Sequence, residues 1–117
     1  MECKNIIRKA KRLIGENISP IEDEELDERC GYILASLFSE LSSIDKKYRK
    51  AHSLSPQPSF HQSYIEASSE FPLCEKFSKA AEFYLAAFLI EADEEKSDLF
   101  YEQYCDSICS ITNSLFS

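Results

Sequence analysis

Apolar residues recur every three or four positions along most of this 117-residue chain. The longest series is Leu26, Cys30, Ile33, Leu37, Leu41, Ile44 and Tyr48. This spacing places side chains on one face of an α-helix, whereas a half-buried β-strand would alternate apolar and polar residues. Glycine, which weakens helices, occurs only at Gly15 and Gly31. We therefore predict an all-α fold, with about four helices in a small antiparallel bundle that forms a single domain, residues 1–117.

Residues that favour helix ends divide the pattern into segments. Gly15 follows the first apolar stripe and is suited to end a helix in a left-handed conformation. Ser19, Pro20 and Glu22 match an N-cap, a first-turn proline and the glutamate of a capping box, and Asp93 is suited to cap the last helix. The predicted elements are a basic first helix in residues 1–15, a long helix in 19–51, a central helix in 72–91 and a last helix in 93–116.

Residues 53–70 interrupt the helical pattern with serines, glutamines, a histidine and two prolines. Pro56 and Pro58 block helix continuation and favour extended backbone. We predict one long irregular loop here, with a short strand or hairpin arm at residues 61–66 as an alternative for part of it. Because so long a connection is unusual in a small domain and often functional, we expect it to be the most mobile element.

The formal net charge of −8 comes from one half of the chain. Residues 51–117 carry three basic and eleven acidic side chains, whereas residues 1–50 carry ten of each. An acidic half repels phosphate backbones, so we expect no tight, sequence-independent nucleic-acid binding by residues 51–117. The basic residues at the start of the chain could touch DNA, although we favour a solvated helix face there. We expect no sequence-specific nucleic-acid binding. The longest strongly apolar stretch without a charge, residues 83–90, is too short to cross a bilayer, and no secretory signal is recognisable. We therefore expect no contact with a membrane.

The sequence has few residues arranged for bond-making chemistry, since it lacks a glycine-rich phosphate loop, an HExxH motif and a Ser-His-Asp set. Cys105 and Cys109 lie one helical turn apart and could bind zinc together with Cys30 or Cys74. We favour buried free cysteines, because the cysteines lie on or beside apolar stripes and lack CxxC spacing. We expect no catalytic, cofactor-binding or metal-binding residues and a reducing cytoplasm. The cysteines and the acidic residues also leave open the hypothesis of a metal-dependent helical enzyme.

Short patterns in residues 71–106 resemble a known family. They are Phe71-Pro72-Leu73, Phe77, Ala80-Ala81, Tyr84-Leu85-Ala86 and, after an acidic turn, Ser97-Asp98-Leu99-Phe100-Tyr101-Glu102-Gln103-Tyr104. In this order, and with the helices before them, they resemble the small head–tail connector, or adaptor, proteins of tailed bacteriophages and prophages. The resemblance implies a non-enzymatic virion structural protein that forms a ring beneath the portal and part of the channel for the genome.

The resemblance also implies partners and a location. The partners would be portal and tail or neck proteins and further copies of the chain in a ring, although the isolated chain could be a monomer. The protein would be made in the bacterial cytoplasm and assembled into the virion, and DNA would pass through the lumen. The candidate contact residues are Phe60, Tyr64 and Ile65 in the loop, Phe100 and Tyr101 in the last helix, and Lys4, Arg8, Lys11 and Arg12 in the first helix. We expect the first helix to dock on an acidic portal surface.

A function of a different class is also compatible with the sequence. The chain could be a small helical regulatory module, of bacterial or phage origin, that binds a protein in a groove between the second and last helices.

Overall fold

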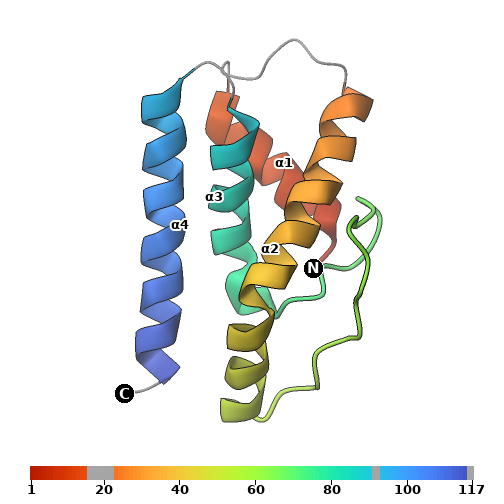
Figure 1. The fold of residues 1–117 in the computed structure, drawn as a ribbon, viewed down its shortest axis with the longest axis vertical. Helices are drawn as coiled ribbons and strands as arrows, with labels where there is room; N and C mark the ends of the chain where they lie inside the picture. The colour runs from red at the N-terminus through yellow and green to blue at the C-terminus, as the bar shows by residue number, and fades with distance from the viewer. Residues whose placement is uncertain (16–22, 91–92, 116–117) are drawn as a thin grey trace.

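The computed structural model describes residues 1–15, 23–90 and 93–115 (Figure 1). These residues form the helices α1 (Cys3–Ile14), α2 (Asp23–Ala51), α3 (Ser78–Leu89) and α4 (Glu94–Leu115), with a short 3-10 turn, η2 (Glu75–Phe77), directly before α3. The described residues include no β-strand, and one isolated antiparallel bridge joins Glu2 to Glu70. The predicted all-α bundle is therefore confirmed.

Helix α3 is the centre of the bundle. It lies between α4 on one side and α1 and α2 on the other (Figure 1). Eight of its twelve residues are buried, among them Ala80, Ala81 and Ala86, whose small side chains allow neighbouring helices to approach closely. This confirms the prediction that the third helix is the most buried one.

Helix α2 sets the length of the molecule. Its 29 residues span about 43 Å at 1.5 Å per residue, which equals the longest dimension of the protein, 43 Å. Leu26, Cys30, Leu37 and Leu41 of the predicted stripe are buried, as is Leu34, whereas Ile33, Ile44 and Tyr48 are half-buried at its edges. The predicted cap of this helix at Ser19, Pro20 and Glu22 lies outside the described residues.

Two helix ends differ from the prediction. Gly15 follows α1 with the expected positive φ of 54°, but its ψ of −120° is not left-handed helical. Helix α3 begins at Ser78, six residues after Pro72. The reason is that the backbone N–H of Cys74 donates to Asp45 Oδ1 at 2.7 Å, which holds residues 72–74 against α2 before the helix can start.

Asp93 caps α4 as predicted, because its Oδ1 accepts a hydrogen bond from the backbone N–H of Lys96 at 3.1 Å. We expect Asp93→Ala to lower the free energy of unfolding by about 1 kcal/mol, the usual effect of removing such a cap. Asp93→Asn is the control, since its amide oxygen can accept the same bond. The midpoints of urea unfolding measure both variants, and equal stability of the alanine variant and the original chain would contradict this role of the carboxylate.

The connection between α2 and η2 runs back along α2 as irregular backbone. Gln57 Nε2 donates to Ser42 O at 3.0 Å and to Asp45 Oδ2 at 2.9 Å, and Arg49 Nη1 donates to Ser55 O at 2.9 Å. The predicted loop is thus confirmed in part: its backbone is irregular, but residues 61–66 form no strand or hairpin, and the isolated bridge to Glu2 lies further on, at Glu70.

The end of this connection caps the first helix. The backbone N–H groups of Cys3 and Lys4 donate to the carbonyls of Ser69 and Ala67 at 2.9 and 2.8 Å. The first N–H groups of a helix have no partners inside that helix, so these carbonyls satisfy donors that would otherwise need water. The loop is thus bonded to α2 near its start and to α1 near its end, and its mobility stays a prediction.

Candidate interaction surfaces

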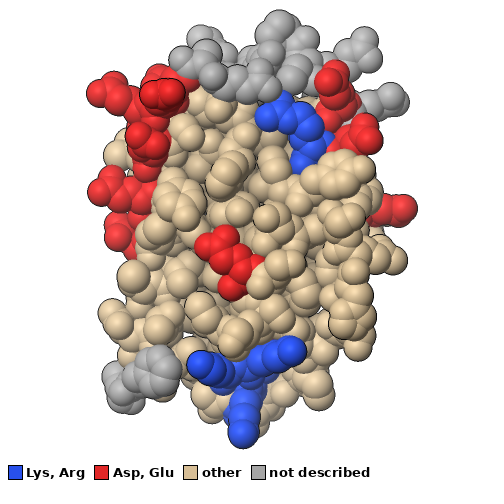
Figure 2. Space-filling model, viewed as in Figure 1, with Lys and Arg blue, Asp and Glu red and all other residues tan. Residues whose placement is uncertain are grey.

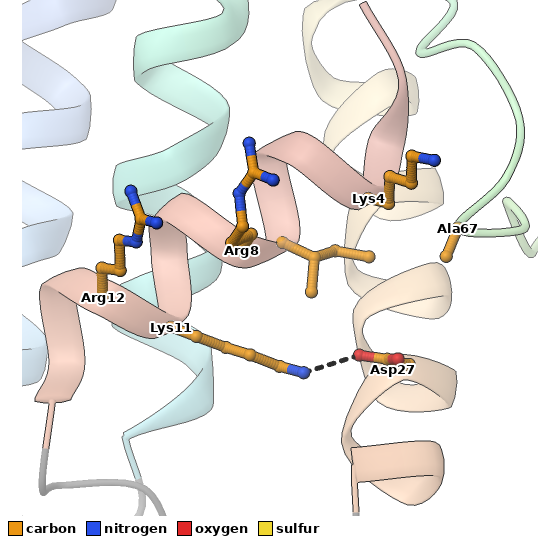
Figure 3. A pocket seen from close by; sticks show the side chains of 7 residues that line it. Lys4, Arg8, Lys11, Arg12, Asp27 and Ala67 are labelled. Atoms are coloured by element: carbon orange, nitrogen blue, oxygen red, sulfur yellow. Dashed lines mark hydrogen bonds and ion pairs between the residues drawn. The ribbon is translucent and has the colours of Figure 1, made fainter.

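A basic cleft of about 350 Å³ lies between α1, α2 and the loop (Figure 3). It is lined by Lys4, Ile7, Arg8, Lys11, Arg12, Asp27 and Ala67. All four basic contact residues predicted from the sequence therefore meet at one site. Lys4, Arg8 and Arg12 recur every four residues, which places them on one face of α1.

Acidic neighbours neutralise only part of this cleft. Lys11 Nζ lies 2.9 Å from Asp27 Oδ1 (Figure 3), and Lys4 Nζ lies 3.2 Å from Glu2 Oε2. Arg8 and Arg12 are exposed and form no ion pair with any residue that the structure describes. Because α1 carries five basic and no acidic residues, its surface attracts negative charge.

A cluster of four aromatic rings joins α3 to α4. The ring centroids of Tyr84 and Tyr104 lie 5.0 Å apart, those of Tyr84 and Phe88 4.7 Å, and those of Tyr101 and Tyr104 5.5 Å. Tyr84 and Tyr104 are buried, but Phe88 is 48% exposed and Tyr101 is 41% exposed. Exposed aromatic rings on a rigid helical pair are typical of surfaces that contact other proteins.

The two buried tyrosines of this cluster remain neutral. Burial, and then the negative charge of Glu40 on α2, raise the pKa of Tyr104 far above its ordinary value. Burial also raises the pKa of Tyr84. These two residues therefore place neutral hydroxyl groups inside the protein, and the part of the cluster that a partner could contact is Phe88 and Tyr101.

The other predicted contact residues are less exposed than Tyr101. Phe100 is half-buried and stacks on Phe83 at 6.5 Å. Phe60 and Tyr64 are half-buried and lie beside a hollow of about 600 Å³ in the loop. Ile65 is only 3% exposed and belongs to the core, so it is not available for contact with another protein, contrary to the expectation from the sequence. Its burial follows from its hydrogen bond to α2, in which Ile65 N donates to Gly31 O at 3.1 Å.

Several exposed apolar residues were absent from the predicted contact set. On the helical pair α3 and α4 they are Phe88 and Leu99, 48% and 54% exposed, and elsewhere in the described residues they are Leu13, Tyr32 and Leu54. The sequence carried a signal for Phe88, because the apolar residues of the third helix surround most of its circumference and one contact cannot hide them all. It carried none for Leu99, whose exposure depends on which side of α4 faces α3.

The cysteines occupy different environments. Cys3 and Cys30 are buried, Cys74 and Cys105 are half-buried, and Cys109 is exposed. Within the described ranges, no group of three or more His, Cys, Asp or Glu side chains is placed to hold a metal ion. Burial raises the pKa of Cys3 to about 11 and that of Cys30 to about 12, so both thiols are neutral at physiological pH.

These differences predict a clear order of alkylation by iodoacetamide. At pH 8 we expect Cys109 to react first and the buried Cys3 and Cys30 to react only when the protein unfolds, because the reagent needs an accessible thiolate. The same raised pKa values make the stability of the protein depend on pH. The stability that the neutral buried thiols contribute is complete below about pH 9, near the ordinary pKa of a thiol. It is lost as the pH rises towards the pKa values of Cys3 and Cys30 in the folded protein, about 11 and about 12. Mass spectrometry of timed samples measures the order, and labelling in urea, where all five thiols should react alike, is the control. Equal labelling of Cys30 and Cys109 in the native protein would contradict the packing of α2.

No helix in the described parts of the chain is both long and apolar enough to cross a membrane. Comparisons of the chain with protein-family models, with curated proteins and with solved structures found no match.

Proposed function

We propose that this chain is a non-enzymatic structural protein of a tailed phage or prophage, a head–tail connector that joins the portal to the tail and forms part of the ring around the DNA. The observation that carries the proposal is the uncovered aromatic surface of Phe88 and Tyr101. It lies on the segment whose sequence pattern resembles the connector family.

The fold of that segment supports an adhesive role. Pro72 and Leu73 are buried and lead into α3, while Ser97 Oγ of α4 donates to the carbonyl of Ala87 at 2.7 Å. The two helices are thus tied at their connected end as well as packed along their length. A rigid helical pair lets exposed rings bind a neighbouring protein without a large loss of conformational entropy.

The charge of the chain is compatible with a DNA channel. Its net charge of −8 disfavours tight binding to phosphate, and a ring through which a genome slides must not retain it.

Particle composition tests the proposal. In the strain that carries the gene, prophages are induced and the purified particles are searched by mass spectrometry for peptides of this chain. Deletion of the gene is expected to leave filled or empty heads and separate tails in electron micrographs. Intact tailed particles from the deletion strain, or purified particles without the chain, would overturn the proposal.

A matched pair of variants connects this phenotype to the aromatic surface. The double variant Phe88→Ser and Tyr101→Ser is expected to fold, because both side chains are largely exposed, but not to restore tailed particles to the deletion strain. Leu54→Ser is the control, since Leu54 is 45% exposed and lies far along the chain from α3 and α4. Full complementation by a folded double variant would exclude this surface from assembly.

The second candidate function is a small regulatory module that binds a protein between α2 and α4. Its support is that α2 and α4 contact each other directly, and that Glu40 of α2 lies close enough to Tyr104 of α4 to raise the pKa of its hydroxyl. This candidate predicts that the chain is absent from particles and that its deletion leaves their morphology unchanged.

A further inference from the structure

We propose that copies of this chain associate head to tail, with the outer face of α4 in one copy packed into the basic cleft of α1 in the next. The inference deepens the proposed function, on which it rests for the existence of a ring, by naming the two surfaces that join neighbouring subunits. Both surfaces are present on every copy.

The outer face of α4 combines negative charge with an exposed apolar residue. Asp98, Glu102 and Asp106 are exposed and form no ion pair within the part of the chain that the structure describes. Leu99 lies beside them and is 54% exposed. Helix α4 carries five acidic residues against one basic residue, and acidic side chains line the edge of the molecule over this helix, at the left of Figure 2.

The two surfaces match in spacing. Lys4, Arg8 and Arg12 recur every four residues on α1, and Asp98, Glu102 and Asp106 recur every four residues on α4. Each series therefore spans about 12 Å at 1.5 Å per residue. Ridges of residues four apart are the surfaces that interdigitate in the commonest helix packing, so each carboxylate can reach one cation.

The apolar parts of the two surfaces also match. The basic cleft is lined by Ile7 and Ala67 as well as by its cations. Leu99, adjacent to the acidic series on α4, is an exposed side chain of a size that can enter the cleft. Burial of a leucine beside the charge pairs provides attraction that salt does not screen, while the charges fix the orientation.

One chain cannot bring its own two surfaces together. Helix α3 lies between α1 and α4 (Figure 1), and no extensive contact joins those two helices. A contact between two different surfaces of identical subunits is heterologous, and repeated contacts of this kind close into a ring when the rotation allows. The same chain thus supplies an acidic partner for α1, and this favours a second copy over the acidic portal surface expected from the sequence.

Two charge-reversed variants test the inference by sedimentation at several hundred micromolar protein in low salt. Variant one carries Arg8→Glu and Arg12→Glu, and variant two carries Asp98→Lys and Glu102→Lys. We expect the original chain to form species larger than dimers and each variant alone to associate about tenfold or more weakly, because like charges then meet. A mixture of the two variants should associate again, since each α1 then finds a complementary α4.

Two controls separate the named contact from net charge and general adhesiveness. Lys46→Glu with Lys47→Glu changes the net charge by the same amount as variant one, but at the exposed end of α2, and should associate like the original chain. Leu99→Ser should weaken association, whereas Leu54→Ser, at a similarly exposed leucine, should not. Circular dichroism of every variant establishes that it is folded.

Three outcomes would overturn the inference: an original chain that stays monomeric at several hundred micromolar, association that stops at dimers, or a mixture of the two variants that stays monomeric. Each is distinguishable from failure of the proposed function. Presence of the chain in particles with unchanged association of the reversed variants would refute only the contact between α1 and α4. Absence from particles with restored association in the mixture would refute only the connector function.

Discussion

Replacement of Asp45 by alanine is expected to destabilise the protein by about 3–5 kcal/mol, a large part of the stability of a domain of this size. Asp45 is fully buried in α2. Its Oδ2 accepts hydrogen bonds from Arg49 Nε at 2.8 Å and Gln57 Nε2 at 2.9 Å, and its Oδ1 accepts one from the backbone N–H of Cys74 at 2.7 Å. The carboxylate therefore joins one helix to two points of the following connection.

The size of the effect follows from what alanine would leave behind. The guanidinium of Arg49, whose side chain is only 15% exposed, would lose its ionic partner, and the N–H of Cys74 would lose its acceptor. Donors left unpaired in a buried site cost more than the net gain that their bonds had provided. Residues 72–74 would also lose the contact that sets where α3 begins.

Thermal unfolding measures this prediction, and the expected decrease in the melting temperature is roughly 10–20 °C. Asp45→Asn keeps the shape of the side chain and one acceptor oxygen but removes the charge. The melting temperature of this variant should therefore lie between those of Asp45→Ala and the original chain. Asp27→Ala is the control, because Asp27 pairs with Lys11 at 2.9 Å in a partly exposed position, where such pairs contribute at most about 1 kcal/mol. Similar melting temperatures for Asp45→Ala and Asp27→Ala would show that the network at Asp45 does not hold the connection.

The helices could be predicted from the sequence because their determinants are local. The apolar spacing of α2, the cap at Asp93 and the apolar circumference of α3 all involve residues within a few turns of one another. Local periodicity therefore identified four helices and their order. The start of α3 was predicted too early, because it depends on Asp45, 29 residues before Cys74.

The same distinction applies to the contact surfaces. The cations of α1 could be assigned to one face because their spacing along one helix is sufficient to place them together. Whether an aromatic ring is exposed depends on which helix covers it, and this is a property of the assembled bundle. Phe100 and Tyr101 are neighbours in the sequence, yet one packs on Phe83 and the other lies 41% exposed. Tyr64 and Ile65 likewise could not be placed without knowing that the loop returns to α2 at Gly31.

Replacement of Gly31 by alanine is the second change with a large expected effect. We expect it to destabilise the protein, although helix propensity favours alanine over glycine. Alanine inside a helix is usually more stable than glycine by about 1 kcal/mol. At this position, however, an added Cβ would lie 2.7 Å from the carbonyl oxygen of Ile65 and closer still to the ring of Tyr64. The tyrosine ring could rotate away, but the backbone of Ile65 could move only if the loop shifted.

Such a shift would remove interactions that hold the loop on α2. Ile65 N donates to Gly31 O at 3.1 Å, the Ile65 side chain is buried, and Tyr64 packs edge-on against Tyr32 at 4.9 Å. Loss of one hydrogen bond and part of the burial of an isoleucine outweighs the gain in propensity, so we expect a net destabilisation of about 2 kcal/mol. The effect should be accompanied by a loop that is more accessible to proteases.

Urea unfolding and limited digestion with chymotrypsin measure the two consequences separately. We expect Gly31→Ala to unfold at lower urea and to be cleaved faster after Phe60 and Tyr64 under native conditions, because a displaced loop exposes these sites. Ser43→Ala, at an exposed position of the same helix, is the matched control and should be as stable as the original chain or slightly more so. The opposite result would be a free energy of unfolding about 1 kcal/mol higher for Gly31→Ala, with an unchanged rate of cleavage. Helix propensity alone would then account for the effect, and the loop could not be packed on α2 at Gly31.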